Sequence, residues 1–257
     1  MNLIYQYFDG DITPEVEAGV HLMTEYAKTV GVEYMFEHNT DFLQTHYQYT
    51  TGNRIQNNDV YFGSLKPLLD PRFDQYDKIL YADVDVLPIE GLTDNIFDEL
   101  TGEVGVVEET FHDRIPPTKL KKLKEWKEEV AVVDVSFNSG VVLYSKQIRE
   151  KARNWFDLPE YVEWMIDKAP RLNDFENRMP DEYFLTAQPY LQYMLHKNNA
   201  DIQLLSQDWN GHIWTDSVKL FNNVSEIWND MRTPTTKFVH CRLRSGNQEE
   251  FIKRRIS

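Results

Sequence analysis

The N-terminal part of the chain carries the hydrophobic pattern of a parallel α/β unit. The apolar run Leu3–Phe8 predicts a buried strand, and the turn-forming residues Asp9-Gly10-Asp11 end it. From residue 16 to residue 30 apolar residues recur at helical spacing, and Gly31 is placed to stop the helix. Residues 32–36 then alternate like a second strand. A strand, a helix and a strand in this order imply that the two strands pair in parallel.

Short apolar runs and amphipathic stretches continue along the rest of the chain. Helical spacing predicts helices near residues 61–69, 148–155 and 184–195. Short strands are expected at residues 78–82 and 237–240. Further apolar runs suit strands buried on both faces: residues 104–107, 130–135 and 141–144. The Lys-rich stretch 119–129 predicts an exposed insertion and is a candidate lid. We therefore expect a single α/β domain over residues 1–257, with a mixed, mainly parallel central sheet flanked by helices.

The composition is that of a folded, strongly acidic protein. Hydrophobic residues make up 41% of the chain and aromatic residues 13%, which is enough to form a core. Because 42 acidic residues face 27 Lys and Arg, the net charge is −15, which disfavours a nucleic-acid-binding protein. The same field would repel an anionic ligand such as a diphosphate. A diphosphate site in this chain would therefore need a local positive charge, most simply a divalent cation.

Cysteine usage and the N-terminus bear on the compartment. Cys241 is the only cysteine, so an internal disulfide and a zinc site built on paired cysteines are excluded. The N-terminus has no basic region ahead of an apolar segment, and no apolar run reaches the ~20 residues that a spanning helix needs. These features predict a cytoplasmic protein without a membrane span.

The pair Asp83 and Asp85 is the first candidate for chemistry. The two carboxylates follow the expected strand at residues 78–82, and in an extended backbone residues i and i+2 point to the same side. They can then share one Mn²⁺ or Mg²⁺, with diphosphate oxygens in other coordination positions. A D-x-D pattern alone is weak, since Asp9-Gly10-Asp11 has it too, and a polar turn is the alternative. The position favours a site, because ligands in open α/β sheets gather at the carboxyl ends of strands.

Four segments in order resemble a known enzyme family. The segments are Asp77-Lys78-Ile79-Leu80-Tyr81-Ala82-Asp83-Val84-Asp85, Phe137-Asn138-Ser139-Gly140, Pro180-Asp181-Glu182 and Lys237-Phe238-Val239-His240. In these segments the chain is similar to the GT-A glycosyltransferases related to glycogenin and to bacterial lipopolysaccharide galactosyltransferases, glycosyltransferase family 8. Together with the strand-helix-strand start, the resemblance covers most of the chain.

The resemblance implies roles for particular residues. It makes His240 the third metal ligand beside Asp83 and Asp85, although a lone histidine is more often a packed one. It implies donor-binding roles for further residues: Tyr7 and Asp9 facing the base and ribose, and Asn138, Ser139 and Gly140 holding the sugar or phosphate. An ordinary turn is the alternative for both groups.

The catalytic pair implied by the resemblance is Asp181 and Glu182. Asp181 would contact hydroxyls of the donor sugar, and the next residue would lie near the anomeric carbon. The family has glutamine there, whereas Glu182 offers a carboxylate that can stabilise positive charge. A helix cap is the alternative for Asp181, because acids are favoured at helix starts.

The chain departs from the family at its basic residues. The family's basic residue before the metal strand falls at Gly63, and Lys66 lies one turn later as a candidate substitute. The K-P-W segment after the histidine is absent, so Arg244 or Arg242 would have to contact phosphate, and either can equally be a surface charge. Three tryptophans suit sugar stacking or the core: Trp209, Trp214 and Trp228.

These observations favour a glycosyltransferase that moves a sugar from a nucleoside-diphosphate donor, a UDP-sugar first, to a saccharide or other hydroxyl acceptor. Mn²⁺ or Mg²⁺ is the expected cofactor, and the family implies retention at the anomeric carbon. Residues 1–88 would form the nucleotide-binding half and residues 89–257 the sugar and acceptor half. The alternatives are a non-catalytic sugar-nucleotide-binding protein of the same fold and another metal-dependent phosphoryl or nucleotidyl transferase. P-loop and G-x-G-x-x-G motifs are absent, which argues against an NTPase and a dinucleotide enzyme.

Overall fold

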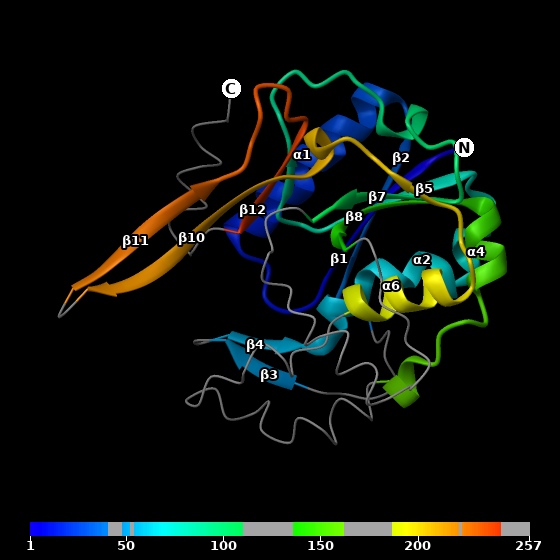
Figure 1. Cartoon of the computed structure of the whole chain (residues 1–257), viewed down its shortest axis with the longest axis horizontal. Coiled ribbons are helices and arrows are strands. Elements are labelled where there is room, and N and C mark those ends of the chain that lie inside the picture. Colours follow the sequence, from blue (N-terminus) through cyan, green and yellow to red (C-terminus); the bar gives the residue numbers. More distant parts are fainter. Residues whose placement is uncertain (41–47, 52–53, 110–135, 162–186, 221–222, 243–257) are drawn as a thin grey trace.

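The computed structural model describes residues 1–40, 48–51, 54–109, 136–161, 187–220 and 223–242. Within these residues a six-stranded sheet has the order β2-β1-β5-β8-β7-β9 (Figure 1). Its strands are β1 (Leu3–Phe8), β2 (Glu33–His38), β5 (Lys78–Ala82), β7 (Val104–Glu108), β8 (Phe137–Ser145) and β9 (Ile202–Leu204). Strands β2, β1 and β5 are parallel, β8 is antiparallel to both of its neighbours, and β9 pairs in parallel with β7. The predicted mixed sheet is confirmed.

Helices lie on both faces of this sheet, as the sequence predicts (Figure 1). Helix α1 (Pro14–Val30) lies on one side, and α2 (Lys66–Leu69) and α6 (Ala187–Lys197) lie on the other (Figure 1). Helix α4 (Lys146–Ala152) follows β8 directly, with Ser145 as its N-cap. Short 3₁₀ segments complete the set: η1 (Asn58–Leu65), η2 (Pro71–Gln75), η3 (Ile96–Asp98) and η5 (Gln207–Asn210).

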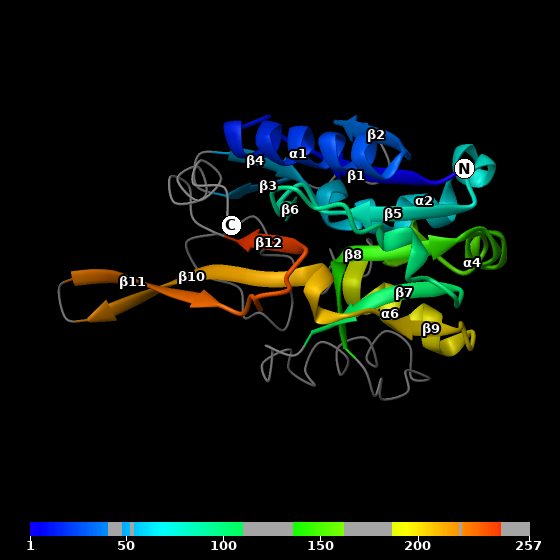
Figure 2. The same cartoon turned by 90° about the horizontal axis from the view of Figure 1, so that it is seen from above.

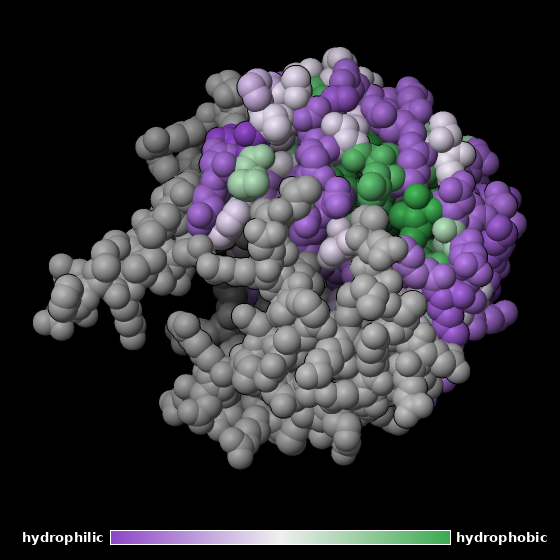
Figure 3. Space-filling model, viewed as in Figure 1, coloured by the Kyte–Doolittle hydropathy of each residue, from purple (hydrophilic) through white to green (hydrophobic). Residues whose placement is uncertain are grey.

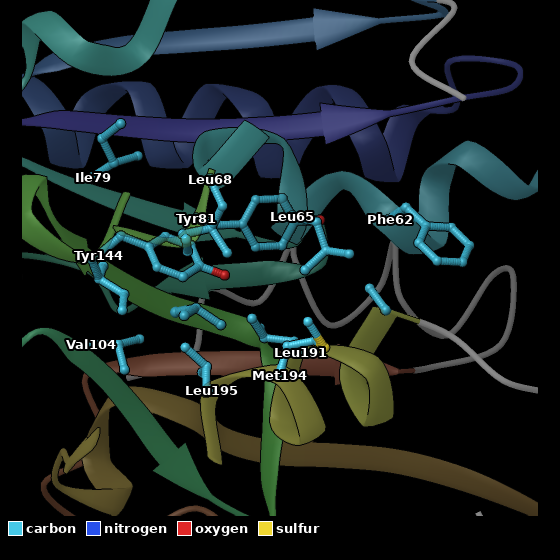
Figure 4. Packing of buried hydrophobic residues seen from close by; sticks show 14 of the residues in the cluster. Phe62, Leu65, Leu68, Ile79, Tyr81, Val104, Tyr144, Leu191, Met194 and Leu195 are labelled. Atoms are coloured by element: carbon cyan, nitrogen blue, oxygen red, sulfur yellow. The ribbon is translucent and has the colours of Figure 1, made fainter. Parts of the chain in front are cut away.

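The alternation of side chains along the strands produces two cores. Tyr5, Tyr81 and Tyr144 point to the side of α2, α4 and α6, where they pack with η1 (Figure 4). The alternate residues of the same strands point to the other side, where they meet α1 and the strand β12 (Phe238–Arg242). The central strands are therefore buried on both faces, which explains why their sequences are continuous apolar runs.

The described residues also form a second, four-stranded sheet. Its order is β11-β10-β12-β6, formed by β6 (Val86–Pro88), β10 (Gly211–Leu220), β11 (Asn223–Asp230) and β12 (Phe238–Arg242). The hairpin of β10 and β11 projects from the body in both cartoon views (Figures 1 and 2). A small hairpin of β3 (Gln48–Thr51) and β4 (Arg54–Asn57) is separate. Apart from β12, these strands were not predicted.

The first α/β unit follows the prediction closely. Strand β1 has the predicted bounds, and α1 ends at Gly31, whose φ of 71° is the left-handed conformation that glycine adopts without strain. The helix predicted at residues 61–69 is wrong for most of its length, because η1 is a 3₁₀ segment and only α2 is α-helical. Pro67 explains the difference, since it has no N–H to donate four residues back.

Several predictions fall outside the described residues. They are the strand at 130–135, the candidate lid at 119–129 and the segment with Asp181 and Glu182. Among the described residues, no helix is long and apolar enough to cross a bilayer. The described part of the face in Figure 3 is mostly hydrophilic, in keeping with the high content of charged residues.

Candidate functional site

The turn that carries Asp83 and Asp85 joins the two sheets. Strand β5 ends at Ala82, and the chain leaves through this turn into β6 of the second sheet. The N–H of Asp83 donates to the carbonyl of Gly140 at 2.8 Å, and the N–H of Cys241 donates to the carbonyl of Asp85 at 2.8 Å. The turn is therefore held by β8 on one side and by β12 on the other.

His240 is brought to this turn by the second sheet. It lies on β12 opposite Val86, so its ring meets the carboxylates that precede β6. Its Nε2 is 3.2 Å from Oδ1 of Asp85 and 4.0 Å from Oδ2 of Asp83. The side chains of Asp83 and Asp85 are 36% and 33% exposed, whereas that of His240 is 4% exposed. A ligand could reach the carboxylates from solvent while the histidine is held from behind.

These three residues form a group that could hold a metal ion, with ligand atoms all within 4.8 Å of one another. In an octahedral site with bonds of 2.0–2.1 Å, neighbouring ligand atoms are about 3 Å apart and opposite ones about 4 Å apart. The distances from His240 to the two carboxylates lie in this range. Two carboxylate oxygens and an imidazole nitrogen suit Mn²⁺ or Mg²⁺. The sequence-predicted ligands thus come together with fitting donor atoms and spacing.

Tyr81 orients Asp83 from the same face of β5. Its hydroxyl donates to Oδ1 of Asp83 at 2.7 Å, while Gln6 donates its amide to the carbonyl of Asp83 at 3.0 Å. Burial, followed by the charge of Asp83, raises the pKa of Tyr81 well above its usual value, so the hydroxyl keeps its proton and acts as the donor. Sequence reasoning missed both residues. The position of Tyr81, two residues before Asp83 on one strand face, was the available signal.

Glycines let the backbone approach the site. A Cβ on Gly140 would lie 2.5 Å from Cε1 of His240 and 2.7 Å from Oδ2 of Asp83, so no side chain fits there. A Cβ on Gly19 of α1 would lie 1.9 Å from the carbonyl oxygen of Val84, so this helix packs directly on the turn that carries Asp83 and Asp85. The close approach of α1 was not foreseen from the sequence.

Asn138, Ser139 and Gly140 lie within strand β8, so the alternative of a simple turn is wrong. Their pairing with β7 is interrupted: Val106 pairs with Val142, and Val107 pairs with Asn138. Asn138 is buried, and Ser139 donates its N–H to Gln188 at 3.3 Å. This segment lies beside the turn that carries Asp83 and Asp85, because Gly140 accepts the hydrogen bond from the N–H of Asp83.

Tyr7, Asp9 and Lys66 lie at the carboxyl end of β1 and beside it. Tyr7 is buried and donates its hydroxyl to the carbonyl of Thr40 at 3.0 Å, and Asp9 is buried just beyond the strand. The ammonium of Lys66 lies 5.1 Å above the ring of Tyr7, donates to the hydroxyl of Thr40 at 2.7 Å and forms an ion pair with Glu37. These contacts occupy Lys66 within the fold, and its proposed contact with a donor stays a prediction.

Gly63 cannot be replaced by a basic residue without rearrangement. A Cβ there would lie 2.9 Å from Cδ1 of Tyr7 and 2.9 Å from the hydroxyl of Tyr81. A basic side chain at position 63 would therefore displace Tyr7 or Tyr81, and Tyr81 is the residue that donates to Asp83.

The remaining candidates divide between the core and the undescribed residues. Trp209 is fully buried and packs edge-on against Phe238, so the core alternative holds for it. Trp214 is half-buried on β10. The side chains that lie outside the described residues belong to Asp181, Glu182, Trp228, Arg242 and Arg244.

A surface cavity of about 480 Å³ lies between α1 and the segment after β6. Its lining includes Leu22, Tyr26, Leu87, Leu92 and Val239. Leu87 pairs with Val239, and the next pair along the two strands joins Val86 to His240. Since side chains alternate along a strand, the cavity lies on the opposite face from His240 and is separate from the candidate metal ligands.

Comparisons with known proteins bear on the fold. No protein-family profile matches the chain, and no curated protein matches it in sequence. Among solved structures, the chain is similar to a glycosyltransferase involved in the glycosylation of the major capsid of PBCV-1, with 13% identity and a TM-score of 0.54 over 98% of each chain. Weaker likenesses are to the glycosyltransferase GlyE of Streptococcus pneumoniae, with 12% identity and a TM-score of 0.36 over 81% of this chain and 46% of that one, and to A197 from STIV, with 13% identity and a TM-score of 0.36 over 80% and 81%. The first likeness, together with the sheet, shows that this chain has an α/β fold of the GT-A-like kind.

Proposed function

We propose that this protein is a divalent-metal-dependent glycosyltransferase that uses a nucleoside-diphosphate sugar. The observation that carries the proposal is the convergence of Asp83, Asp85 and His240 at the carboxyl end of β5 in a GT-A-like fold. This is the position where ligands of open α/β sheets collect. The similarity to a solved glycosyltransferase supports the same reading through the fold.

Asp83, Asp85 and His240 would hold Mn²⁺ or Mg²⁺, whose chemistry there would be stabilisation of the negative charge on the diphosphate leaving group. The carboxylates are each about one third exposed, so diphosphate oxygens can approach from solvent. The chain has a net charge of −15, which repels a diphosphate. The bound ion would provide the local positive charge that offsets this repulsion.

The chain's own residues would position the donor. Asn138, Ser139 and Gly140 lie beside the metal turn and would hold the sugar or phosphate, and Tyr7 and Asp9 lie at the end of the neighbouring strand, where base and ribose would bind. Asp181 and Glu182 would contact the sugar, as their family resemblance implies. The bond between the anomeric carbon and the diphosphate breaks, its electron pair leaves with the diphosphate, and the acceptor hydroxyl forms the new bond and loses its proton.

The finer assignments rest on the resemblance to glycosyltransferase family 8. They are a UDP-sugar donor carrying a hexose, retention at the anomeric carbon, a saccharide or other hydroxyl acceptor, and the division of one domain into halves at residue 88. A cytoplasmic location rests on the single cysteine and stays a prediction.

A screen of nucleoside diphosphates and their sugars tests the proposal. With Mn²⁺ present, the correct nucleotide at 100 times its dissociation constant should stabilise the protein by about 2.7 kcal/mol, and chelation should remove the effect. The donor that stabilises is then incubated with the protein and Mn²⁺, and sugar release is followed. Binding with slow donor hydrolysis supports a transferase. Binding without any turnover, with or without acceptors, favours the non-catalytic alternative, and cleavage between the phosphates would favour a phosphoryl or nucleotidyl transferase.

A further inference from the structure

Three buried hydrogen bonds connect His240 to the backbone of β8. Nδ1 of His240 is 3.2 Å from Oδ1 of Asn210, and Nδ2 of Asn210 is 3.2 Å from Oδ1 of Asn138. Oδ1 of Asn138 also accepts the N–H of Gly140 at 2.9 Å. His240 and Asn210 are each 3% exposed and Asn138 is 7% exposed. The chain of bonds therefore runs through the interior from the metal ligand to the strand behind it.

The direction of this chain is fixed at its Gly140 end. A backbone N–H can only donate, so the Asn138 atom that faces it must be the oxygen. That oxygen can only accept, so the atom that Asn210 turns toward it must be the NH₂ group. Asn210 then presents its own oxygen to His240, and the ring must donate from Nδ1. The amide orientations follow from the bonding pattern and leave one consistent assignment.

We propose that Asn210 is a positioning residue that keeps a proton on Nδ1 of His240, so that Nε2 is the ring nitrogen that offers a lone pair to a cation held between it and the carboxylates of Asp83 and Asp85. The inference rests on the proposed metal site, because a metal ligand must offer a lone pair. The other ring nitrogen of a ligating histidine commonly donates to an oxygen, which fixes the tautomer and the ring orientation. Here the oxygen belongs to Asn210 and is itself oriented by Asn138.

Local structure places Asn210 for this role. It ends η5 and is followed at once by β10, which pairs in parallel with β12 and sets His212 opposite His240. The two rings stack with centroids 4.5 Å apart and planes 28° apart. Stacking limits tilting of the His240 ring, and the bond to Asn210 selects which nitrogen carries the proton. The two contacts together fix the direction of Nε2.

The tautomer can be read directly by NMR. In protein labelled with ¹⁵N and ¹³C in histidine, the ring shifts of His240 distinguish protonation on Nδ1 from protonation on Nε2, without metal and with Mg²⁺. The wild type should have a proton on Nδ1 with and without metal; without metal, Nε2 lies 3.2 Å from Oδ1 of Asp85 and can donate to that carboxylate as well. Asn210→Asp loses the NH₂ that donates to Asn138, but it still offers an oxygen to Nδ1 and should keep the proton there. Asn210→Leu removes the acceptor, so the Nε2-protonated tautomer should appear, and Mn²⁺ affinity should fall about 10- to 100-fold.

Asn198→Leu is the control, because Asn198 bonds to the carbonyl of Met194 at the end of α6, away from the cluster. It should leave the His240 tautomer and Mn²⁺ affinity unchanged. The inference is overturned if Nδ1 of the wild-type His240 carries no proton, or if Asn210→Leu leaves the proton on Nδ1 as in the wild type. Both readings are made without metal, so they stand apart from the proposed function. A protein with the expected tautomer that binds no metal would contradict the proposed function alone.

Discussion

The carboxylates of Glu37 and Asp83 both lie near the carboxyl ends of strands in the central sheet. Each accepts a hydrogen bond from a buried tyrosine, but the two have different charged neighbours. In the parallel pair of β1 and β2, Glu37 lies opposite Tyr7. In the parallel pair of β1 and β5, Tyr81 lies opposite Tyr5, and Asp83 follows Tyr81 by two residues. Glu37 accepts the hydroxyl of Tyr5 at 2.8 Å, and Asp83 accepts the hydroxyl of Tyr81 at 2.7 Å. Glu37 is thus oriented by a buried tyrosine of the neighbouring strand β1, and Asp83 by a buried tyrosine of β5, the strand that it follows.

The difference lies in what each carboxylate faces. Glu37 forms ion pairs with two basic side chains of the protein, Lys66 and Arg72. Asp83 instead lies in a group with a second carboxylate and the Nε2 of His240, in which the ligand atoms converge. Charges of opposite sign from the chain build a structural ion pair, whereas two like charges converging with an imidazole build a cation site. The first cluster should therefore govern stability and the second metal binding.

Glu37→Gln should have the largest effect on stability. The substitution leaves the ammonium of Lys66 facing a neutral amide, although its side chain is only 5% exposed. Breaking a buried pair on one side costs about 3–5 kcal/mol, and the value here should lie near the lower end because Arg72 is exposed. Urea unfolding measures the loss, and Mn²⁺ affinity should stay within a few-fold.

Glu25→Gln is the matched control for that variant. Glu25 pairs with Lys28 at 2.7 Å on the exposed side of α1, with side chains 52% and 68% exposed. An exposed helix pair is screened by solvent, so Glu25→Gln should lose much less stability than Glu37→Gln. Equal losses in the two variants would mean that the Glu37 cluster is not a buried structural pair.

Gly140→Ala should affect metal binding more than stability, because Gly140 lies against the candidate metal ligands. The added Cβ would push on His240 and on the carboxylate of Asp83. A displaced ligand set should lower Mn²⁺ affinity on the order of 100-fold, the upper range for perturbing the surroundings of metal ligands. Gly91→Ala is a useful comparison in unfolding, since Gly91 has a φ of 74° but nothing within 4 Å of a Cβ. Unchanged metal binding in Gly140→Ala would mean that the cluster is not the site.

The sequence predicted the group of Asp83, Asp85 and His240 better than it predicted the residues that position this group. The D-x-D pattern, its place after an apolar run and the late histidine point to ligands, because these residues carry recognisable chemistry. Asn210 lies 30 residues from His240 and Gly19 lies on a helix far along the chain from Val84, so no local pattern joins them to the site. Their roles depend on how β12 and α1 pack, which a periodic pattern does not specify.

The fold shows the same division. Strands β1 and β5 were predicted with their bounds, since buried parallel strands are continuous apolar runs. The hairpin of β10 and β11 was missed, because its strands carry mixed polar sequences such as GHIWTDSVKL without a sustained apolar run. The helix at 61–69 failed through Pro67, whose missing N–H interrupts the helical ladder.

The two clusters should also differ in their response to acid. Burial alone would raise the pKa of Glu37, but hydrogen bonds from Lys66, Tyr5 and Arg72 outweigh it and hold this pKa below its usual value. The stabilisation is therefore complete above the ordinary glutamate pKa of about 4.3 and is lost as the pH falls through the lower folded-state value. Between about pH 5 and pH 3 the wild type should lose more stability than Glu37→Gln does. Parallel losses in urea titrations over this range would contradict the assignment.

Removing either tyrosine hydroxyl should produce the smallest effects and separate the clusters. Tyr81→Phe and Tyr5→Phe each delete one hydrogen bond to a carboxylate, at a cost of about 1 kcal/mol of stability. Tyr81→Phe should also weaken Mn²⁺ binding by less than about 10-fold, because Asp83 loses its orienting donor. Tyr5→Phe should leave Mn²⁺ binding unchanged. Identical metal affinities in the two variants would remove Tyr81 from the support of the site.

The central claim is that Asp83, Asp85 and His240 bind a divalent ion together with a nucleoside diphosphate. Calorimetric titration of UDP in the presence and absence of Mn²⁺ tests it most directly, with Asp85→Asn beside the control Asp11→Asn, which alters the other D-x-D at an exposed residue. The account predicts that wild type and Asp11→Asn bind UDP in a Mn²⁺-dependent manner, and that Asp85→Asn loses this dependence. Unchanged affinity and metal dependence in Asp85→Asn would contradict the account.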